Sequence, residues 1–350
     1  MESGIALAHA YHREVVGPLL RREVPRLPHA VGRLGHGSDV LGFDDEVSRD
    51  HDWGLRLQLL LDDADADLVP YLDELLEREL PNRFRGHPVR FPMTWDPRPR
   101  HKVSVGTVNG FARERLGFGF DPADTVGWLM LTGQAVLEVT AGPVFADTTA
   151  WLGPLRASLR HYPAEVERYV LAAGWHRLAR LPLHARAAET GQPMAARRLA
   201  GTLAEDVMRQ AFRLCRTWAP YDKWFERAFQ RLPIAAELTG PLTTVLHSGD
   251  PRVREDALVT AVRVLLARQR ERGLPTPPNG VGPFFTRASR AVRPEVPAAL
   301  LAGLTDPVLR RLPPEAGAID QWLDNPWLLA RPAMRAPLAA AYGQWLSIDR

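Results

Sequence analysis

Apolar positions in the first half of the chain alternate between helical and strand-like spacing. Residues 5–16 predict an amphipathic helix, with apolar side chains every four positions, which Gly17-Pro18 should end or kink. Residues 68–80 also have helical spacing and stop at Pro81. Short apolar or alternating segments predict strands at residues 30–34, 52–61 and 101–108.

A further pair of strands is expected near residue 140. The apolar segments 135–139 and 144–145 flank Thr140-Ala141-Gly142-Pro143, which is typical of a hairpin turn. With the elements above, this gives the first 150 residues a mixed α/β character.

Beyond Trp151 the pattern becomes helical, and no strand is expected after Asp147. Helical segments are predicted at residues 166–178, 199–215, 256–266 and 338–345, with a Pro-rich connector at 273–283. The predicted fold class is therefore α+β. A mixed sheet with flanking helices over residues 1–150 precedes an all-helical domain over residues 151–350, and we expect the site in the cleft between them.

Composition limits the classes of function. The 350 residues are 45% hydrophobic and 24% charged, which is ordinary for a soluble globular enzyme. Lys and Arg number 44 against 41 Asp and Glu, and a net charge of +3 argues against nucleic acid as a partner without excluding it. A single cysteine, Cys215, excludes an internal disulfide. With no leader or membrane-spanning segment in the pattern, we expect a cytoplasmic protein without a membrane partner.

The candidate chemistry lies between residues 37 and 52. On the predicted strand, Asp50 and Asp52 project to the same side, about 7 Å apart. Two carboxylates held so close repel each other unless a cation lies between them, and hard oxygen ligands favour Mg²⁺. Upstream, the bend at Gly37-Ser38 would offer backbone N–H groups and a hydroxyl to phosphate.

This arrangement resembles the nucleotidyltransferase superfamily that includes DNA polymerase beta and the aminoglycoside nucleotidyltransferases. Gly37-Ser38 and Asp50-His51-Asp52 match its motif, although Arg49 separates Ser48 from the first aspartate. More narrowly, residues 37–54 look like the signature of a bacterial family known as a domain of unknown function, DUF4037. The likeness continues in residues 142–147 and 219–224.

The resemblance implies transfer of a nucleoside monophosphate from an NTP, expected to be ATP, to an acceptor hydroxyl on a small molecule, with release of pyrophosphate. Asp50 and Asp52 would bind one or two Mg²⁺ ions, and Glu138 is the tentative third carboxylate, ahead of Asp147. Gly37, Ser38 and Arg49 would bind the nucleotide. From the helical domain, Tyr221 and Lys223 would add aromatic and cationic contacts to it.

Plainer interpretations accompany each of these. Asp44, Asp45 and Glu46 are expected to stabilise a turn, and His51 to point away from both aspartates. Two alternative functions also stay open. One is a toxin-like enzyme of the same chemistry that modifies tRNA or protein. The other is a nucleotide-binding regulatory or interaction protein with a degenerate site, which the lack of an acid in residues 101–108 favours.

Overall fold

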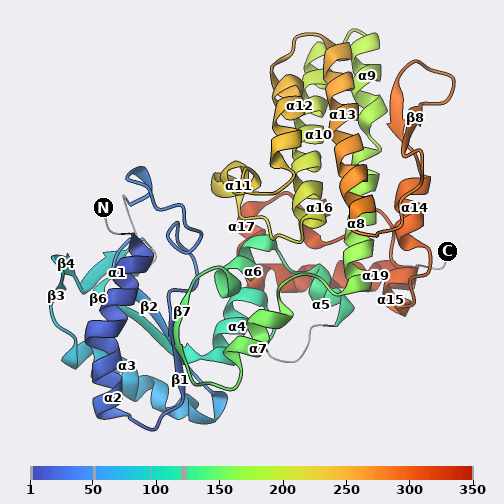
Figure 1. Ribbon diagram of the computed structural model, residues 1–350. Coiled ribbons are helices and arrows are strands. Elements are labelled where there is room, and N and C mark those ends of the chain that lie inside the picture. Colours follow the sequence, from blue (N-terminus) through green and yellow to red (C-terminus); the bar gives the residue numbers. More distant parts are fainter. Residues whose placement is uncertain (1–2, 50–52, 95, 120–123, 349–350) are drawn as a thin grey trace. The chain divides into compact units, whose positions relative to one another are not determined.

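The computed structural model describes residues 3–49, 53–94, 96–119 and 124–348 (Figure 1). The chain forms two compact units, and it passes between them several times. The first unit comprises Met1–Pro122, Gln134–Arg160 and Arg331–Ala333, and the second comprises Ala123–Gly133, His161–Ala330 and Met334–Arg350.

This division differs from the single predicted boundary at residue 150. The segment 123–133 belongs to the second unit because Leu129 and Met130 are buried there in one apolar cluster with Tyr169, Val170 and Tyr342. Residues 134–160 then return to the first unit. Long-range burial of two side chains decided this, and local spacing does not reveal it.

The first unit opens with one continuous helical segment. Helix α1 (Gly4–Tyr11) runs into a π-helical turn (His12–Val16) and then into α2 (Gly17–Glu23). The sequence predicted that Gly17-Pro18 would end or kink the helix, and the structure shows that the helical segment does not end there. The wider π turn precedes Pro18, which occupies the first turn of α2, where its missing N–H costs little.

A five-stranded mixed sheet forms the centre of this unit, in the order β5-β6-β2-β1-β7. Strands β2 and β6 are parallel, and the other neighbours are antiparallel. The strands are β1 (His29–Gly32), β2 (Arg56–Leu61), β5 (Arg90–Met93), β6 (Asp96–Thr107) and β7 (Val144–Asp147), and a separate small hairpin joins β3 (Arg83–Phe84) to β4 (His87–Pro88).

Helices α1, α2 and α3 (Val69–Glu79) cover one face of the sheet. Their apolar side chains form one cluster with Leu57 and Leu59 of β2 and Val103 of β6. The other helical elements of this unit are a 3-10 turn (Asp63–Leu68), α3 (Val69–Glu79), α4 (Val108–Leu116), α6 (Gly133–Thr140) and α7 (Leu152–Ser158).

Three predicted strands need correction. β2 begins at Arg56 rather than at residue 52, because Gly54 has φ +146, a backbone conformation that interrupts an extended strand. β6 begins five residues earlier than predicted, in its hairpin with β5. Residues 135–139 are helical in α6, where Val136 and Val139 are buried at a spacing of three. A short apolar run does not distinguish a strand from a helix.

The second unit is helical, as predicted, apart from one small hairpin of β8 (Val281–Pro283) and β9 (Arg290–Val292), which the sequence analysis missed. Helices α9, α10, α12 and α13 lie side by side around an apolar core (Figure 1). The helices are α5 (Thr125–Leu129), α8 (Ala164–Leu178), α9 (Leu181–Glu189), α10 (Pro193–Leu214), α11 (Asp222–Phe229), α12 (Ala235–His247), α13 (Pro251–Glu271), α14 (Glu295–Leu301), α15 (Pro307–Arg311), α16 (Ile319–Trp322), α17 (Pro326–Leu329), α18 (Pro332–Arg335) and α19 (Ala339–Ser347), with a 3-10 turn at Ala336–Leu338.

Among the helices within the described ranges, none combines the length and the apolar character needed to cross a bilayer.

Candidate functional site

The candidate site lies where β1 ends, next to the beginning of β2 and the middle of β6. Gly32 of β1 pairs with Gln58 of β2, and Arg56 of β2 stands beside Lys102 of β6. Because side chains alternate along a strand, Arg56, Gln58 and Lys102 share the face opposite the large apolar cluster. Polar and cationic groups therefore gather at the edge where β1 leaves the sheet.

The bend of residues 33–39 follows β1 and is held by a buried ion pair. Arg33 donates from Nε and Nη2 to the two carboxylate oxygens of Asp39, at 2.7 Å each, and these side chains are 2% and 5% exposed. Gly37 lies against this pair with φ +147, and a Cβ there would come within 2.3 Å of Asp39 and 2.4 Å of Arg33. The ion pair therefore requires glycine at position 37.

Two backbone donors of the bend have no acceptor among the residues that the structure describes. They are the N–H groups of Gly37 and Ser38, both only partly buried. By contrast, the N–H of Gly35 donates to the carbonyl of Glu138 at 2.7 Å. Adjacent N–H groups without partners favour an anion, and phosphate oxygens are the usual acceptors at such bends.

The Ser38 hydroxyl joins the bend to the end of the following loop, since its Oγ donates to the carbonyl of Ser48 at 3.2 Å. Within the loop, Asp45 accepts hydrogen bonds from the N–H and the hydroxyl of Ser48, at 3.0 and 2.7 Å. Asp44 accepts from the N–H of Gly4 at 2.6 Å. Asp44 and Asp45 thus stabilise the loop, as expected for a turn.

One cationic side chain, Arg56, approaches the bend from β2. Arg56, only 7% exposed, contacts the His36 ring at 2.7 Å, from its Nη2 to Nε2 of the imidazole. Lys102 is directed to Asp96 of its own strand, with Nζ 3.1 Å from the carboxylate. Hydrogen bonds from Arg98 and Lys102 lower the pKa of Asp96 to about 2, so this carboxylate stays ionised beside Lys102.

Glu138 lies beside the bend, on helix α6 rather than on the predicted strand. Its carboxylate accepts from Arg115 and from Gln134, each at 3.1 Å, and is 16% exposed. The less favoured candidate, Asp147, is on β7, where its carboxylate accepts from the N–H and hydroxyl of Thr149. Of the two candidates, the structure brings Glu138 to the bend.

Asp50, His51 and Asp52 lie outside the described residues, as does the side chain of Arg49, and their assigned roles remain predictions. Within the described ranges, no three His, Cys, Asp or Glu side chains are grouped in a way that could bind a metal ion. The predicted Mg²⁺ site therefore depends on Asp50 and Asp52.

Tyr221 and Lys223 belong to the second unit, at the beginning of α11. Tyr221 is 45% exposed. The Lys223 ammonium lies 4.9 Å from the ring centroid of Trp224, which is itself buried. This contact fits Trp224 as an aromatic residue of the core. Nucleotide binding by Tyr221 and Lys223 remains a prediction.

The sequence analysis missed the charged residues that surround the bend. Arg33 and Asp39 flank the glycine-serine motif, and Arg56 opens β2, whose other residues are apolar except Gln58. A cation within a buried strand is costly unless it has a partner, so Arg56 was a signal that could have been used. Arg115 carried no such signal, because it lies on a helix with several other charged residues.

Comparison with known proteins gives a limited set of findings. The family model "Domain of unknown function (DUF4037)" matches residues 128–225. This range includes two of the three motifs of the resemblance, at residues 142–147 and 219–224, and leaves out residues 37–54. No curated protein matches the sequence.

A solved structure, of a nucleotidyltransferase-like protein from Exiguobacterium sibiricum 255-15, has 13% sequence identity and a TM-score of 0.34. The alignment covers 76% of this chain and 78% of that chain. A likeness of this size does not by itself define a shared fold or activity.

Proposed function

We propose, from the geometry of its glycine-serine bend, that this chain is a magnesium-dependent nucleotidyltransferase. The match of residues 128–225 to the DUF4037 model is consistent with the family resemblance of the sequence. The reaction would move a nucleoside monophosphate from an NTP to a hydroxyl group of a small molecule. The acceptor oxygen forms a bond to the α-phosphorus, the bond from that phosphorus to the bridging oxygen breaks, and pyrophosphate leaves.

The observation that carries the proposal is the pair of N–H donors at Gly37 and Ser38, which have no acceptor within the described part of the chain. They follow a strand and precede a loop that returns to the same sheet edge, so they suit the phosphate oxygens of a triphosphate. The Arg33–Asp39 pair keeps the bend in this conformation before any ligand binds, which lowers the entropy cost of binding.

The segments on both sides of residues 50–52 contact this bend. Ser48 accepts from Ser38, and Arg56 contacts His36. This supports the proposal that Asp50 and Asp52 act beside the phosphates. When bound by these aspartates, Mg²⁺ would neutralise charge that develops on the α-phosphate. Arg56 would add positive charge on the same side of the sheet.

Glu138 is the proposed acceptor of the proton that the attacking hydroxyl loses. Its backbone carbonyl is bonded to Gly35, so its position relative to the bend is set by α6. Arg115 and Gln134 each donate to one of its carboxylate oxygens, which orients the carboxylate. Replacement of Glu138 by Gln should therefore lower kcat more than it raises KM.

The test is release of pyrophosphate and transfer of label from each of the four α-labelled NTPs, in Mg²⁺, with pooled small-molecule hydroxyl compounds as acceptors. We expect Asp50→Asn and Asp52→Asn each to reduce transfer at least about a hundredfold while the folded state persists. Asp67→Asn is the matched control, because Asp67 is an exposed carboxylate in the 3-10 turn after β2. Wild-type rates in both aspartate variants would rule out the proposal.

One observation favours the alternative of a nucleotide-binding protein without turnover. On β6, Lys102 stands beside Arg56, and the acid of that strand, Asp96, is paired with Lys102. Within the described residues, β6 therefore supplies a cation to this part of the sheet and no third carboxylate. Two results together would support this alternative over transfer. The wild type would bind Mg²⁺ and a non-hydrolysable NTP, and Asp50→Asn would abolish that binding. The wild type would release no pyrophosphate with any acceptor.

A further inference from the structure

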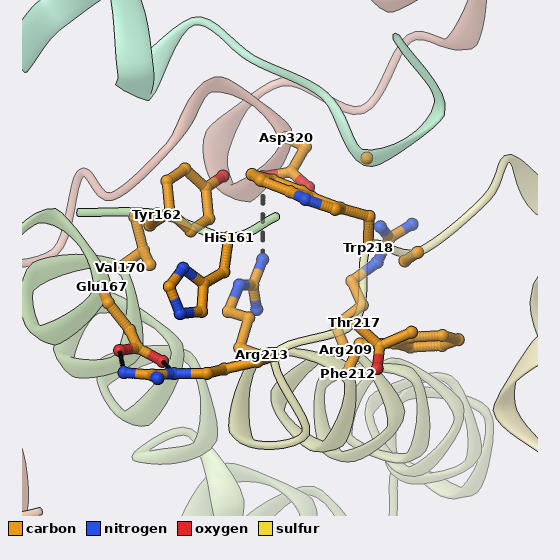
Figure 2. A pocket seen from close by; sticks show the side chains of 13 residues that line it. His161, Tyr162, Glu167, Val170, Arg209, Phe212, Arg213, Thr217, Trp218 and Asp320 are labelled. Atoms are coloured by element: carbon orange, nitrogen blue, oxygen red, sulfur yellow. Dashed lines mark hydrogen bonds and ion pairs between the residues drawn. The ribbon is translucent and has the colours of Figure 1, made fainter. Parts of the chain in front are cut away.

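The second unit contains a partly open cavity that the proposed transfer reaction does not use (Figure 2). It lies where the residues before and within α8 meet the C-terminal end of α10, and Asp320 of α16 closes one side. Its walls include aromatic rings and three arginines. A concave site with apolar walls and a few charged groups suits a small organic ligand.

One wall of the cavity is fixed by an ion cluster. Glu167 accepts hydrogen bonds from Arg216, at 2.7 and 3.0 Å, and from Arg272 at 2.6 Å. Burial opposes ionisation of Glu167, but the two guanidinium groups outweigh it and lower the pKa of this carboxyl. Glu167 therefore stays charged and holds Arg216 in place.

Arg216 has a backbone conformation that glycine usually adopts. Its φ is +51, directly after α10, and the N–H of Thr217 donates to the carbonyl of Phe212 as in a helix-ending motif. An arginine in this left-handed conformation costs about 1 kcal/mol or more relative to glycine. Strained backbone of this kind occurs mostly at functional sites, and the Arg216 side chain lines the cavity.

Arg213 is the cation that faces the cavity without a hydrogen bond. Its guanidinium makes none to any part of the chain that the structure describes, and the carboxylate of Asp320 is 3.6 Å away (Figure 2). The side chain is only 11% exposed. Arg209 and Arg216, by contrast, each donate to a glutamate at 3.0 Å or less. A nearly buried guanidinium with unused donors favours an anionic acceptor.

Aromatic side chains border the same space. The rings of Tyr162 and Trp218 are 4.6 Å apart between centroids and tilted by 59°. Val170 and Phe212 add apolar surface to the lining. The cavity thus combines a guanidinium that has unused donors with aromatic and apolar side chains.

We propose that this cavity binds a small carboxylate with a flat apolar body, with the carboxylate on Arg213 and the body against Tyr162 and Trp218. A guanidinium and a carboxylate match as a planar, two-bond pair. A doubly charged phosphate is disfavoured, because Asp320 and Glu167 lie in the same lining and would repel the second charge.

Isothermal titration calorimetry of the full chain with sodium benzoate tests the proposal. We expect benzoate to bind, and its neutral isostere benzamide and inorganic phosphate each to bind at least about tenfold more weakly. In Arg213→Gln, the dissociation constant for benzoate should rise at least about tenfold, to the level of benzamide. Arg198→Gln, an exposed position on the same helix, is the charge control and should bind as the wild type does.

If Arg213→Gln does not fold, Arg213→Lys serves instead. It keeps the charge but loses the planar pair of donors, and it should weaken benzoate binding severalfold. Three results would overturn the proposal: no benzoate binding by the wild type, equal binding in the Arg213 variant, or phosphate binding that exceeds benzoate binding. None of these depends on nucleotide transfer, so failure here leaves the proposed transferase activity to its own test.

Discussion

At the scale of single residues, the candidate phosphate site depends on the absence of a side chain at position 37. Among the glycines with positive φ, Gly37 combines an unfavourable backbone angle with contact to a buried ion pair. Gly86 has φ +82 with open space around it. A substitution at Gly86 measures the cost of the backbone angle alone, whereas a substitution at Gly37 adds the cost of displacing charged groups.

We therefore expect Gly37→Ala to destabilise the protein by about 3 kcal/mol and Gly86→Ala by about 1 kcal/mol. The added Cβ at position 37 must push Asp39 or Arg33 out of their ion pair, which leaves a buried charge poorly paired. Urea unfolding of both variants measures this difference. Equal costs would show that the Arg33–Asp39 pair does not restrain the bend.

At the scale of elements, helices α9 and α13 are joined by a buried histidine that acts as an acceptor. His184 on α9 accepts from Nε of Arg254 on α13 at 3.1 Å, and the imidazole is fully buried. Burial, and then the charge of Arg254, lower the pKa of His184 from 6.5 to about 4. The folded state therefore holds this ring neutral in the range where an unfolded chain would protonate it.

The sign of the pH dependence follows from proton binding. Between pH 6.5 and 4 the unfolded chain binds more protons at His184 than the folded chain does. The contribution of neutral His184 to the free energy of unfolding is therefore complete above pH 6.5 and is lost as the pH falls toward 4. We expect the free energy of unfolding of His184→Gln to fall less over this range than that of the wild type, by up to about 3 kcal/mol. Parallel curves of urea-unfolding free energy against pH for the two proteins would contradict this.

At the scale of the whole molecule, the two units are not consecutive in the chain. The second unit takes residues 123–133 from within the first half, and Leu129 and Met130 of that segment are buried among α8, α15 and α19. A chain cut at residue 150 would remove these side chains from their core.

A comparison of two fragments tests this division. Residues 123–350 should be more stable to urea than residues 151–350, by about 3 kcal/mol or more, since the shorter fragment loses two buried apolar side chains. Circular dichroism gives the unfolding midpoints of both. A shorter fragment of equal stability would show that the boundary near residue 150 describes the folding unit after all.

The local pattern of apolar residues determined several of the longer elements. The helical second half, the helix after β2 and the alternation of β6 were all predicted, because buried faces repeat with the period of the element. The α+β fold class followed from these elements. The motif at residues 37–54, continued at residues 142–147 and 219–224, indicated the DUF4037 family, whose model matches residues 128–225 and not the first motif.

Only the tertiary structure decided which segments belong together. In the folded chain, residues 135–139 are helical and Glu138 lies beside the bend. Arg33 pairs with Asp39, and Arg56 contacts His36. It also gathered residues from three helices around Arg213. These contacts depend on packing between distant segments, and the spacing of residues along a chain encodes the period of each element but not its neighbours.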